Sequence, residues 1–216
     1  MEIVIDVRDV SLKIKEKVIL SNVHLQCGRG EICGIIGRNG SGKTMLMKCI
    51  CGFVRPTSGF IQVRGEQIGK ERDFISGAGI IIETPGFIPY YSGIKNLRLL
   101  ASVQNKIADP EIKEAMKKAG LDPDMKRAVR KYSLGMKQRL GLAQAIMEDP
   151  EIMILDEPFN GLDKEGVLEM RAYFLEMKKA GKTILLCSHT AEDIKILCDR
   201  VYEMENGTLT GLGVSG

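Results

Sequence analysis

Tryptophan is absent from the 216 residues of this chain, and aromatic side chains make up only 5% of them. Proteins that bind single-stranded nucleic acids stack bases on aromatic side chains, so the composition argues against that class. An excess of basic charge is missing too, because 31 Lys and Arg stand against 28 Asp and Glu, a net charge of +3. Nucleic-acid binders usually carry a concentrated basic stripe, and we therefore expect no nucleic-acid partner.

Long apolar runs are also missing, since no stretch approaches the roughly 20 residues that cross a bilayer. Met1–Val7 alternates apolar and charged residues and lacks the apolar core of a signal peptide. We expect that any role at a membrane needs a partner chain. The six cysteines form no CxxC pair, which is typical of reduced, mostly buried thiols in a cytosolic protein.

Strand and helix patterns alternate along most of the chain. Period-two alternation and short apolar runs predict strands at residues 2–7, 18–26, 31–36, 60–63, 79–82, 152–155, 183–187 and 200–204. Helices are predicted at residues 43–51, 94–104, 110–119, 135–147, 164–179 and 191–198. Asp109 before Pro110 predicts the N-cap of one of these helices.

Interleaved strands and helices indicate a largely parallel, buried sheet. The strand signal vanishes between Thr84 and Asp149, where the patterns are helical. We therefore predict an α/β fold in which one domain spans residues 1–216. Its parallel core comprises about 1–83 and 150–216, with a strand-rich flank at the N-terminus, and an all-helical lobe at about 84–149 interrupts it.

A glycine-rich segment between a predicted strand and a predicted helix matches G-x-x-x-x-G-K-[ST], the pattern of a phosphate-binding loop. Its glycines let backbone N–H groups turn onto phosphate oxygens, and the following helix adds its positive dipole end. Lys43 would reach the β- and γ-phosphates, and the Thr44 hydroxyl would bind Mg²⁺. A strand-to-helix turn without ligand is the alternative, but a chance match arises about once in a hundred such chains. The expected phosphate-loop residues are Gly37, Arg38, Asn39, Gly40, Ser41, Gly42, Lys43, Thr44 and Met45.

Two carboxylates follow the apolar strand at residues 152–155. Acids released at the carboxyl end of a buried strand lie where ligands of α/β sheets bind, beside the phosphate loop. Asp156 suits a Mg²⁺ site, and Glu157 suits a general base that polarises the attacking water. A plain acidic surface loop is the alternative, and the phosphate loop in the same chain argues against it.

With these motifs in this order, the chain resembles the nucleotide-binding domains of ABC transporters over nearly all of its length. Lys131–Arg139 resembles the family's signature, with matches at Ser133, Gly135, Gln138 and Arg139 and departures at Leu134 and Met136. The segment Asn160–Asp163 resembles the D-loop, which lines the dimer interface, and His189 resembles the histidine that contacts the γ-phosphate. The fold implied is that of a phosphate-loop NTPase.

The resemblance implies an ATPase that uses Mg²⁺ and works as a homo- or heterodimer, with Ser133 and Gly135 acting on the partner's nucleotide and Asp163 at the interface. It also implies a transmembrane permease on a separate chain and a cytoplasmic location on the inner face of a bacterial membrane. Glu83 stands where the family usually has Gln and is a further candidate Mg²⁺ ligand. This Glu, together with the signature variant, resembles the bacitracin- and lantibiotic-resistance branch. The aromatic residue that stacks on adenine in the family is missing around Ile14.

Other classes share parts of the pattern. A GTPase or kinase has the same loop, and Asn105–Asp109 resembles the guanine-reading N-K-x-D, but its Asp comes one position late and the signature is left unexplained. A soluble ABC-type ATPase, in cluster assembly or regulation, is an alternative that the sequence leaves open. A catalytically inactive cassette is disfavoured by the presence of Lys43, Asp156, Glu157 and His189.

Overall fold

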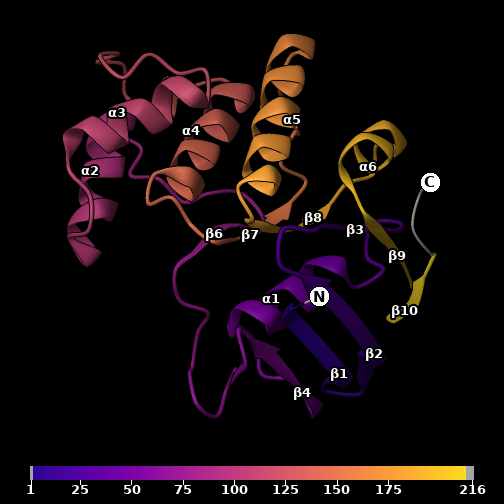
Figure 1. Ribbon diagram of the computed structural model, residues 1–216. Helices are drawn as coiled ribbons and strands as arrows, with labels where there is room; N and C mark the ends of the chain where they lie inside the picture. Colours follow the sequence, from indigo (N-terminus) through magenta and orange to yellow (C-terminus); the bar gives the residue numbers. More distant parts are fainter. Residues whose placement is uncertain (1, 213–216) are drawn as a thin grey trace.

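The strands of the chain form two sheets in the computed structural model, which describes residues 2–212 (Figure 1). The first sheet is antiparallel and has the order β2-β1-β4-β5. Its strands are β1 (Ile3–Ile14), β2 (Lys17–Gly28), β4 (Ser58–Val63) and β5 (Glu66–Gln67). This sheet is the strand-rich flank that the sequence predicted at the N-terminus.

The second sheet has the order β10-β9-β3-β8-β7-β6, and every pair in it is parallel except β10 with β9. Its central strands are apolar and buried, as parallel sheets covered on both faces require. Its strands are β3 (Ile32–Ile36), β6 (Ala78–Ile81), β7 (Ile152–Asp156), β8 (Thr183–Cys187), β9 (Arg200–Glu205) and β10 (Thr208–Gly211).

Helices cover the two faces of the parallel sheet (Figure 1). On one side, α1 (Lys43–Cys51) lies between this sheet and the antiparallel one. On the other side lie α5 (Lys164–Lys179), α6 (Ala191–Leu197) and the helical lobe, which follows β6 and precedes β7. The elements of the helical lobe are α2 (Gly93–Gln104), α3 (Asp109–Lys118), the 3-10 helix η1 (Val129–Lys131) and α4 (Leu134–Ile146).

Alternate residues of the parallel strands enter two hydrophobic cores. Ile152 and Ile154 of β7 face the core shared with α1 and the antiparallel sheet. Met153 and Leu155 of the same strand face a core that runs without interruption through α5 and the helical lobe. Successive side chains of a strand point to opposite faces, so a short apolar run serves both cores.

Several details differ from the sequence-based expectation. β1 continues beyond Val7 to Ile14, because shifts in its register with β2 let the pairing resume after Asp9 adopts a positive φ of 53°. The N-cap of α3 is Ala108 rather than Asp109, and the backbone N–H of Ala108 donates to the Glu111 carboxylate. The short strands β5 and β10 were not predicted.

All six cysteines are buried and free, as predicted. Burial raises the pKa of Cys49 to about 11 and that of Cys51 to about 12, so these thiols are protonated and unreactive at neutral pH. Within residues 2–212, no helix is both long and apolar enough to cross a membrane.

Candidate functional site

The predicted phosphate loop connects the end of β3 to the start of α1. Gly37 and Gly42 have φ values of 146° and 119°, which side-chain-bearing residues rarely adopt. A Cβ on Gly37 would lie 2.3 Å from the Met204 carbonyl oxygen, so the close approach of β9 also requires glycine there. Gly42 caps α1 without any side-chain hydrogen bond, and the first N–H groups of the helix therefore remain available to a ligand.

Lys43 and Ser41 equip this loop for an anion. Lys43 is only 6% exposed, and its Nζ donates to the carbonyl oxygens of Gly37 at 2.6 Å and Arg38 at 3.1 Å. The ammonium therefore lies inside the curve of the loop. The Ser41 Oγ is buried and is the one such side-chain atom within residues 2–212 that has no hydrogen-bond partner. A buried donor without a partner and a buried cation together fit a phosphate group.

Thr44 and Asp156 meet across the carboxyl edge of the parallel sheet. The Thr44 hydroxyl donates to Asp156 Oδ2 at 2.6 Å, joining the first turn of α1 to the end of β7. Both residues line a cleft of about 440 Å³ together with Lys43 and Glu157. A hydroxyl and carboxylates facing one space form the hard oxygen donor set that Mg²⁺ prefers. The residues present therefore fit a Mg²⁺–phosphate ligand.

Glu157 and His189 form a close pair beside this cleft. Glu157 Oε2 lies 2.8 Å from His189 Nδ1 and also accepts from the His189 backbone N–H at 3.4 Å. The Glu157 backbone has φ of 51° and donates to the Cys187 carbonyl oxygen at 3.0 Å, which anchors it to β8. The structure thus brings the predicted base and the predicted histidine together, with the carboxylate able to accept a proton.

A larger cleft of about 940 Å³ joins the phosphate loop to the histidine. Gly37–Ser41, Ser188 and His189 line it, together with residues of β9. The phosphate loop and His189 therefore face one space, although 144 residues separate Thr44 from His189 in the sequence. Ile14 is 45% exposed and lines neither of these two clefts.

A buried ion pair that the sequence analysis missed supports the loop carrying His189. Asp193 Oδ1 accepts from Arg171 Nε at 2.8 Å and Nη2 at 2.6 Å, and its Oδ2 accepts from the Ser188 hydroxyl at 2.9 Å. Ser188 Oγ in turn accepts from the Thr190 N–H at 3.1 Å, so hydrogen bonds hold the backbone on both sides of His189. Asp193 and Arg171 are 2% and 6% exposed, where only paired charges are tolerated.

Asp193→Asn should lower kcat for ATP hydrolysis about ten-fold while the KM for ATP changes less than about two-fold. The physical reason is that the His189 loop loses its anchor, whereas the phosphate loop is untouched. Steady-state kinetics and thermal unfolding would separate this effect from misfolding.

Glu192→Gln is the matched control, because Glu192 pairs with the same Arg171 at 3.3 Å but is 69% exposed on its side chain. It should stay within about two-fold of the unmodified chain, as exposed pairs contribute little. If both variants lowered kcat equally, only the charge balance at Arg171 would matter. That result would contradict a positioning role for Asp193.

The structure does not bring Ser133 and Gly135 to the phosphate loop of the same chain. Ser133 caps α4 by accepting from the Met136 N–H at 3.2 Å, and neither residue lines the clefts described above. Gly135 packs against the D-loop-like segment, where a Cβ would lie 2.4 Å from the Gly161 carbonyl oxygen. Leu134, a departure from the family pattern, is 67% exposed.

Asp163 lies at the start of α5 and accepts from Arg139 Nη2 at 2.7 Å and the Gly166 N–H at 3.2 Å. The hydrogen bond from Arg139 is the larger cause that lowers the pKa of Asp163. Gln138, next to Arg139, donates to the carbonyl oxygens of Glu157 at 3.2 Å and Pro158 at 2.9 Å. The signature helix and the segment carrying the base are therefore connected directly.

Glu83 forms an ion pair with α1 in this structure. It has φ of 60°, its side chain is 63% exposed, and Oε1 lies 2.6 Å from Lys48 Nζ on α1. It does not line the cleft that contains Thr44 and Asp156. The structure thus shows an ion pair with Lys48 where the sequence analysis expected a candidate metal ligand.

The phosphate loop after β3 encloses the side chain of Lys43. Asp156 at the end of β7, two strands away in the sheet, contacts Thr44, and Glu157 follows it. This arrangement defines a phosphate-loop NTPase. A model of the family described as ABC transporter matches residues 20–160. The chain belongs to the ABC transporter family. It is an ATP-binding subunit that hydrolyses ATP to drive transport, and the findings do not favour the soluble alternative.

Relatives support this assignment over nearly the whole chain. The chain is 42% identical to the uncharacterized ABC transporter ATP-binding protein YybJ of Bacillus subtilis (strain 168), covering 95% of this chain and 94% of the relative. It is 36% identical to the bacitracin transport ATP-binding protein BcrA of Enterococcus faecalis, over 97% of this chain and 68% of that relative. It is 35% identical to the lantibiotic transport ATP-binding protein SrtF of Streptococcus pyogenes, over 90% of this chain and 83% of that relative. The predicted resemblance to this branch is confirmed.

Solved structures confirm the predicted fold class. The structure of an ATP binding subunit of an ABC transporter has a TM-score of 0.85 at 28% identity, covering 97% of this chain and 90% of that chain. The dimeric structure of MJ0796, a bacterial ABC transporter cassette, has a TM-score of 0.84 at 22% identity, over 96% of this chain and 98% of that chain. At that lower identity the likeness shows the fold alone.

Proposed function

We propose that this ATPase powers export of, or immunity to, antimicrobial peptides or drugs through a transmembrane permease on a separate chain, and that it works at the inner face of a bacterial cell membrane. The names of the relatives from Enterococcus faecalis and Streptococcus pyogenes supply the substrate class. The observation that carries the proposal is the pairing of Thr44 with Asp156 and of Glu157 with His189 around the phosphate loop. Such a site converts ATP binding and hydrolysis into movement of an attached partner.

The residues divide the hydrolytic work among them. Lys43 and the N–H groups of the phosphate loop bind and orient the β- and γ-phosphates. Glu157 Oε2 accepts the proton of the attacking water, and His189, held against it, orients that carboxylate. Thr44, Asp156 and Glu83 are the proposed Mg²⁺ ligands, and the ion when bound offsets the negative charge that develops on the phosphates.

The ATP-bound form is proposed to be a dimer, either of two copies or with a related subunit. Ser133 and Gly135 lie apart from the nucleotide clefts of their own chain, so they are free to act on the partner's nucleotide. The N-terminus of α4 offers N–H donors beside Ser133. The MJ0796 cassette, which has the same fold, is described as dimeric, and we propose that Asp163 lies at the interface of such a dimer here.

A groove between the parallel core and the helical lobe is the proposed docking surface for the permease. It has a volume of about 730 Å³, and the exposed apolar side chains Phe53, Leu100 and Val103 line it. Val103 is 80% exposed, and a partner seated in the groove would bury it. The groove also contains Thr84 and Pro85, which directly follow Glu83, so docking there would adjoin this proposed Mg²⁺ ligand.

Val103→Asp is the test of the transport proposal. Co-expressed with its proposed permease partner, the variant should lose at least about ten-fold in the amount recovered with membranes, because a buried charge without a partner opposes docking. Leu168→Asp changes another exposed apolar residue, on α5 outside the groove, and should be recovered with membranes as the unmodified chain is. Full membrane recovery of Val103→Asp with intact drug resistance would contradict the proposed docking surface.

Glu83 must leave Lys48 before it can reach Mg²⁺, and an exposed ion pair costs only roughly 0–1 kcal/mol to break. Glu83→Ala should therefore lower the ATPase rate roughly ten-fold, and Glu83→Gln should lose less because an oxygen ligand remains. ATPase assays at varied Mg²⁺ are the measurement. Lys48→Met breaks the same ion pair but retains Glu83. If Lys48→Met lowered the ATPase rate as much as Glu83→Ala does, the loss would come from the broken ion pair and not from a missing Mg²⁺ ligand.

A further inference from the structure

The positive charge of the chain is concentrated on the helical lobe. Residues 84–149 contain twelve Lys and Arg against seven Asp and Glu, whereas the remaining residues contain 19 against 21. The chain as a whole has a net charge of only +3, so the lobe carries an excess that the rest of the molecule partly cancels. Clustered basic charge of this kind attracts anions.

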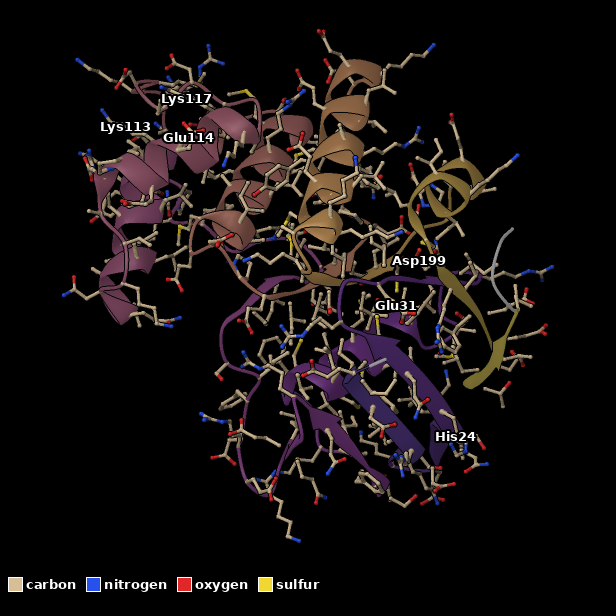
Figure 2. All side chains as sticks on the ribbon, viewed as in Figure 1. His24, Glu31, Lys113, Glu114, Lys117 and Asp199 are labelled. Atoms are coloured by element: carbon tan, nitrogen blue, oxygen red, sulfur yellow. The ribbon has the colours of Figure 1, made fainter. Side chains whose placement is uncertain are left out.

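Part of this charge surrounds a pocket of about 460 Å³ at the N-terminal end of α2. The pocket lies between that helix end, α3 and the segment that follows α3. Four of the lining side chains are basic and one, Asp124, is acidic; the basic ones are Lys95, Arg98, Lys113 and Lys126. Figure 2 shows Lys113 in the helical lobe, at the opposite end of the view from His24 on β2.

Two of these four cations are already paired. Arg98 binds the Asp109 carboxylate through Nε at 2.7 Å and through Nη2, and Lys113 Nζ lies 3.5 Å from Asp124 Oδ1. Lys95 and Lys126 form no ion pair with any carboxylate in the described part of the chain, residues 2–212. The pocket therefore offers two unneutralised ammonium groups to an incoming anion.

Ser92 adds a hydroxyl donor to the pocket. It is the N-cap of α2, is 8% exposed and lines the pocket, yet its side chain forms neither a cap hydrogen bond nor another one within residues 2–212. N-cap serines usually satisfy a first-turn N–H of their own helix. Here the Ser92 hydroxyl remains available toward the pocket.

The first turn of α2 supplies further donors. The Gly93 N–H already donates to the Tyr132 hydroxyl at 3.3 Å, and the Asn96 N–H to the Ser92 carbonyl oxygen at 3.1 Å. The N–H groups of Ile94 and Lys95 have no partner inside the helix, since the first turn lacks preceding carbonyls. These groups and the helix dipole favour an anion at this end.

We propose that this pocket binds a phosphate group, with Ser92 and the first turn of α2 as hydrogen-bond donors and Lys95 and Lys126 as counter-charges. No residue of the pocket lines either nucleotide cleft, so the site is separate from the one that hydrolyses ATP. The pocket is larger than inorganic phosphate alone requires, and a phosphate monoester or the headgroup of an anionic phospholipid fits this chemistry. Tyr132 joins the helix end to Ser133 of the signature, which places the site beside the ATPase machinery.

Inorganic phosphate is the first probe, measured by isothermal titration calorimetry on the full chain saturated with MgADP, so that the phosphate loop is already occupied. Lys95→Glu and Lys126→Glu should each weaken phosphate binding about ten-fold. Lys117→Glu makes the same charge change on α3 outside the pocket and should change binding less than about two-fold. Equal weakening by all three variants would indicate diffuse attraction and would overturn the proposal.

Ser92→Ala separates ligand binding from folding. Because the Ser92 side chain makes no cap hydrogen bond, the variant should keep its Tm while phosphate binding falls about three-fold. Vesicles of phosphatidylglycerol, compared with phosphatidylcholine in a sedimentation assay, identify the source of the phosphate group. If phosphatidylglycerol vesicles capture the chain, and Lys126→Glu abolishes this capture whereas Lys117→Glu preserves it, the ligand is a lipid headgroup. If the chain binds phosphate but is not captured by the vesicles, the ligand is a soluble phosphate compound. Binding in neither assay overturns the proposal.

Discussion

Glu157→Gln is expected to lower steady-state ATP hydrolysis by about 10²- to 10⁴-fold, the range that a positioned general base contributes. The amide keeps the size and shape of the carboxylate and its contact to His189, but it does not accept the proton of the attacking water. ATP binding should be retained, because the phosphate loop and the Thr44–Asp156 contact are unchanged. The variant should therefore accumulate as an ATP-bound dimer.

The measurement combines ATPase turnover with size-exclusion chromatography in the presence of MgATP. Glu176→Gln, which removes one carboxylate from α5 away from both clefts, is the control and should hydrolyse ATP normally. If Glu157→Gln turned over ATP near the unmodified rate, another group would have to be the base. His189 alone would be the next candidate from this geometry.

Lys43→Ala is expected to weaken ATP binding itself, by about ten- to a hundred-fold. Hydrogen bonds to charged groups contribute roughly 1.5–3 kcal/mol, and each 1.4 kcal/mol corresponds to a factor of ten in Kd. Lys43 is buried within the loop, so no neighbouring cation replaces it without a rearrangement. Hydrolysis should fall as a consequence of lost binding.

Fluorescent-nucleotide titration would measure the Kd for ATP directly. Lys70→Ala, which removes an exposed lysine from a loop outside the clefts, should leave the Kd within about two-fold. Unchanged affinity in Lys43→Ala would contradict the assignment of Gly37–Thr44 as the phosphate loop. Loss of binding together with loss of the thermal transition would instead indicate misfolding, so the Tm is recorded for both variants.

The phosphate loop and the acid pair could be predicted from sequence because their chemistry is local. Eight consecutive residues specify the loop, and a run of apolar residues fixes where Asp156 and Glu157 leave the sheet. The order of the remaining motifs then identified the family. The resemblance implied that His189 contacts the γ-phosphate, whereas the contact between Glu157 and His189 was not predicted.

Contacts between distant elements could not be predicted in the same way. Arg171 and Asp193 look like ordinary polar residues of two helices, and only the packing of α5 against α6 turns them into a buried pair. The pairing of Glu83 with Lys48 depends likewise on how α1 lies beside the end of β6. Charge and periodicity reveal which face of a helix is polar, but not which opposite charge it meets.

The uninterrupted hydrophobic core between the helical lobe and α5 has a consequence for unfolding. Leu140 and Leu142 of α4 belong to the same buried cluster as Phe174 of α5 and Leu155 of β7. Elements that share one core lose their packing together, so the chain should melt in a single cooperative transition. Amide hydrogens of α4 should then exchange as slowly as those of the central strands, although α4 belongs to an inserted segment. Deleting residues 84–149 would expose the part of this core that the helical lobe covers and leave a remnant prone to aggregation.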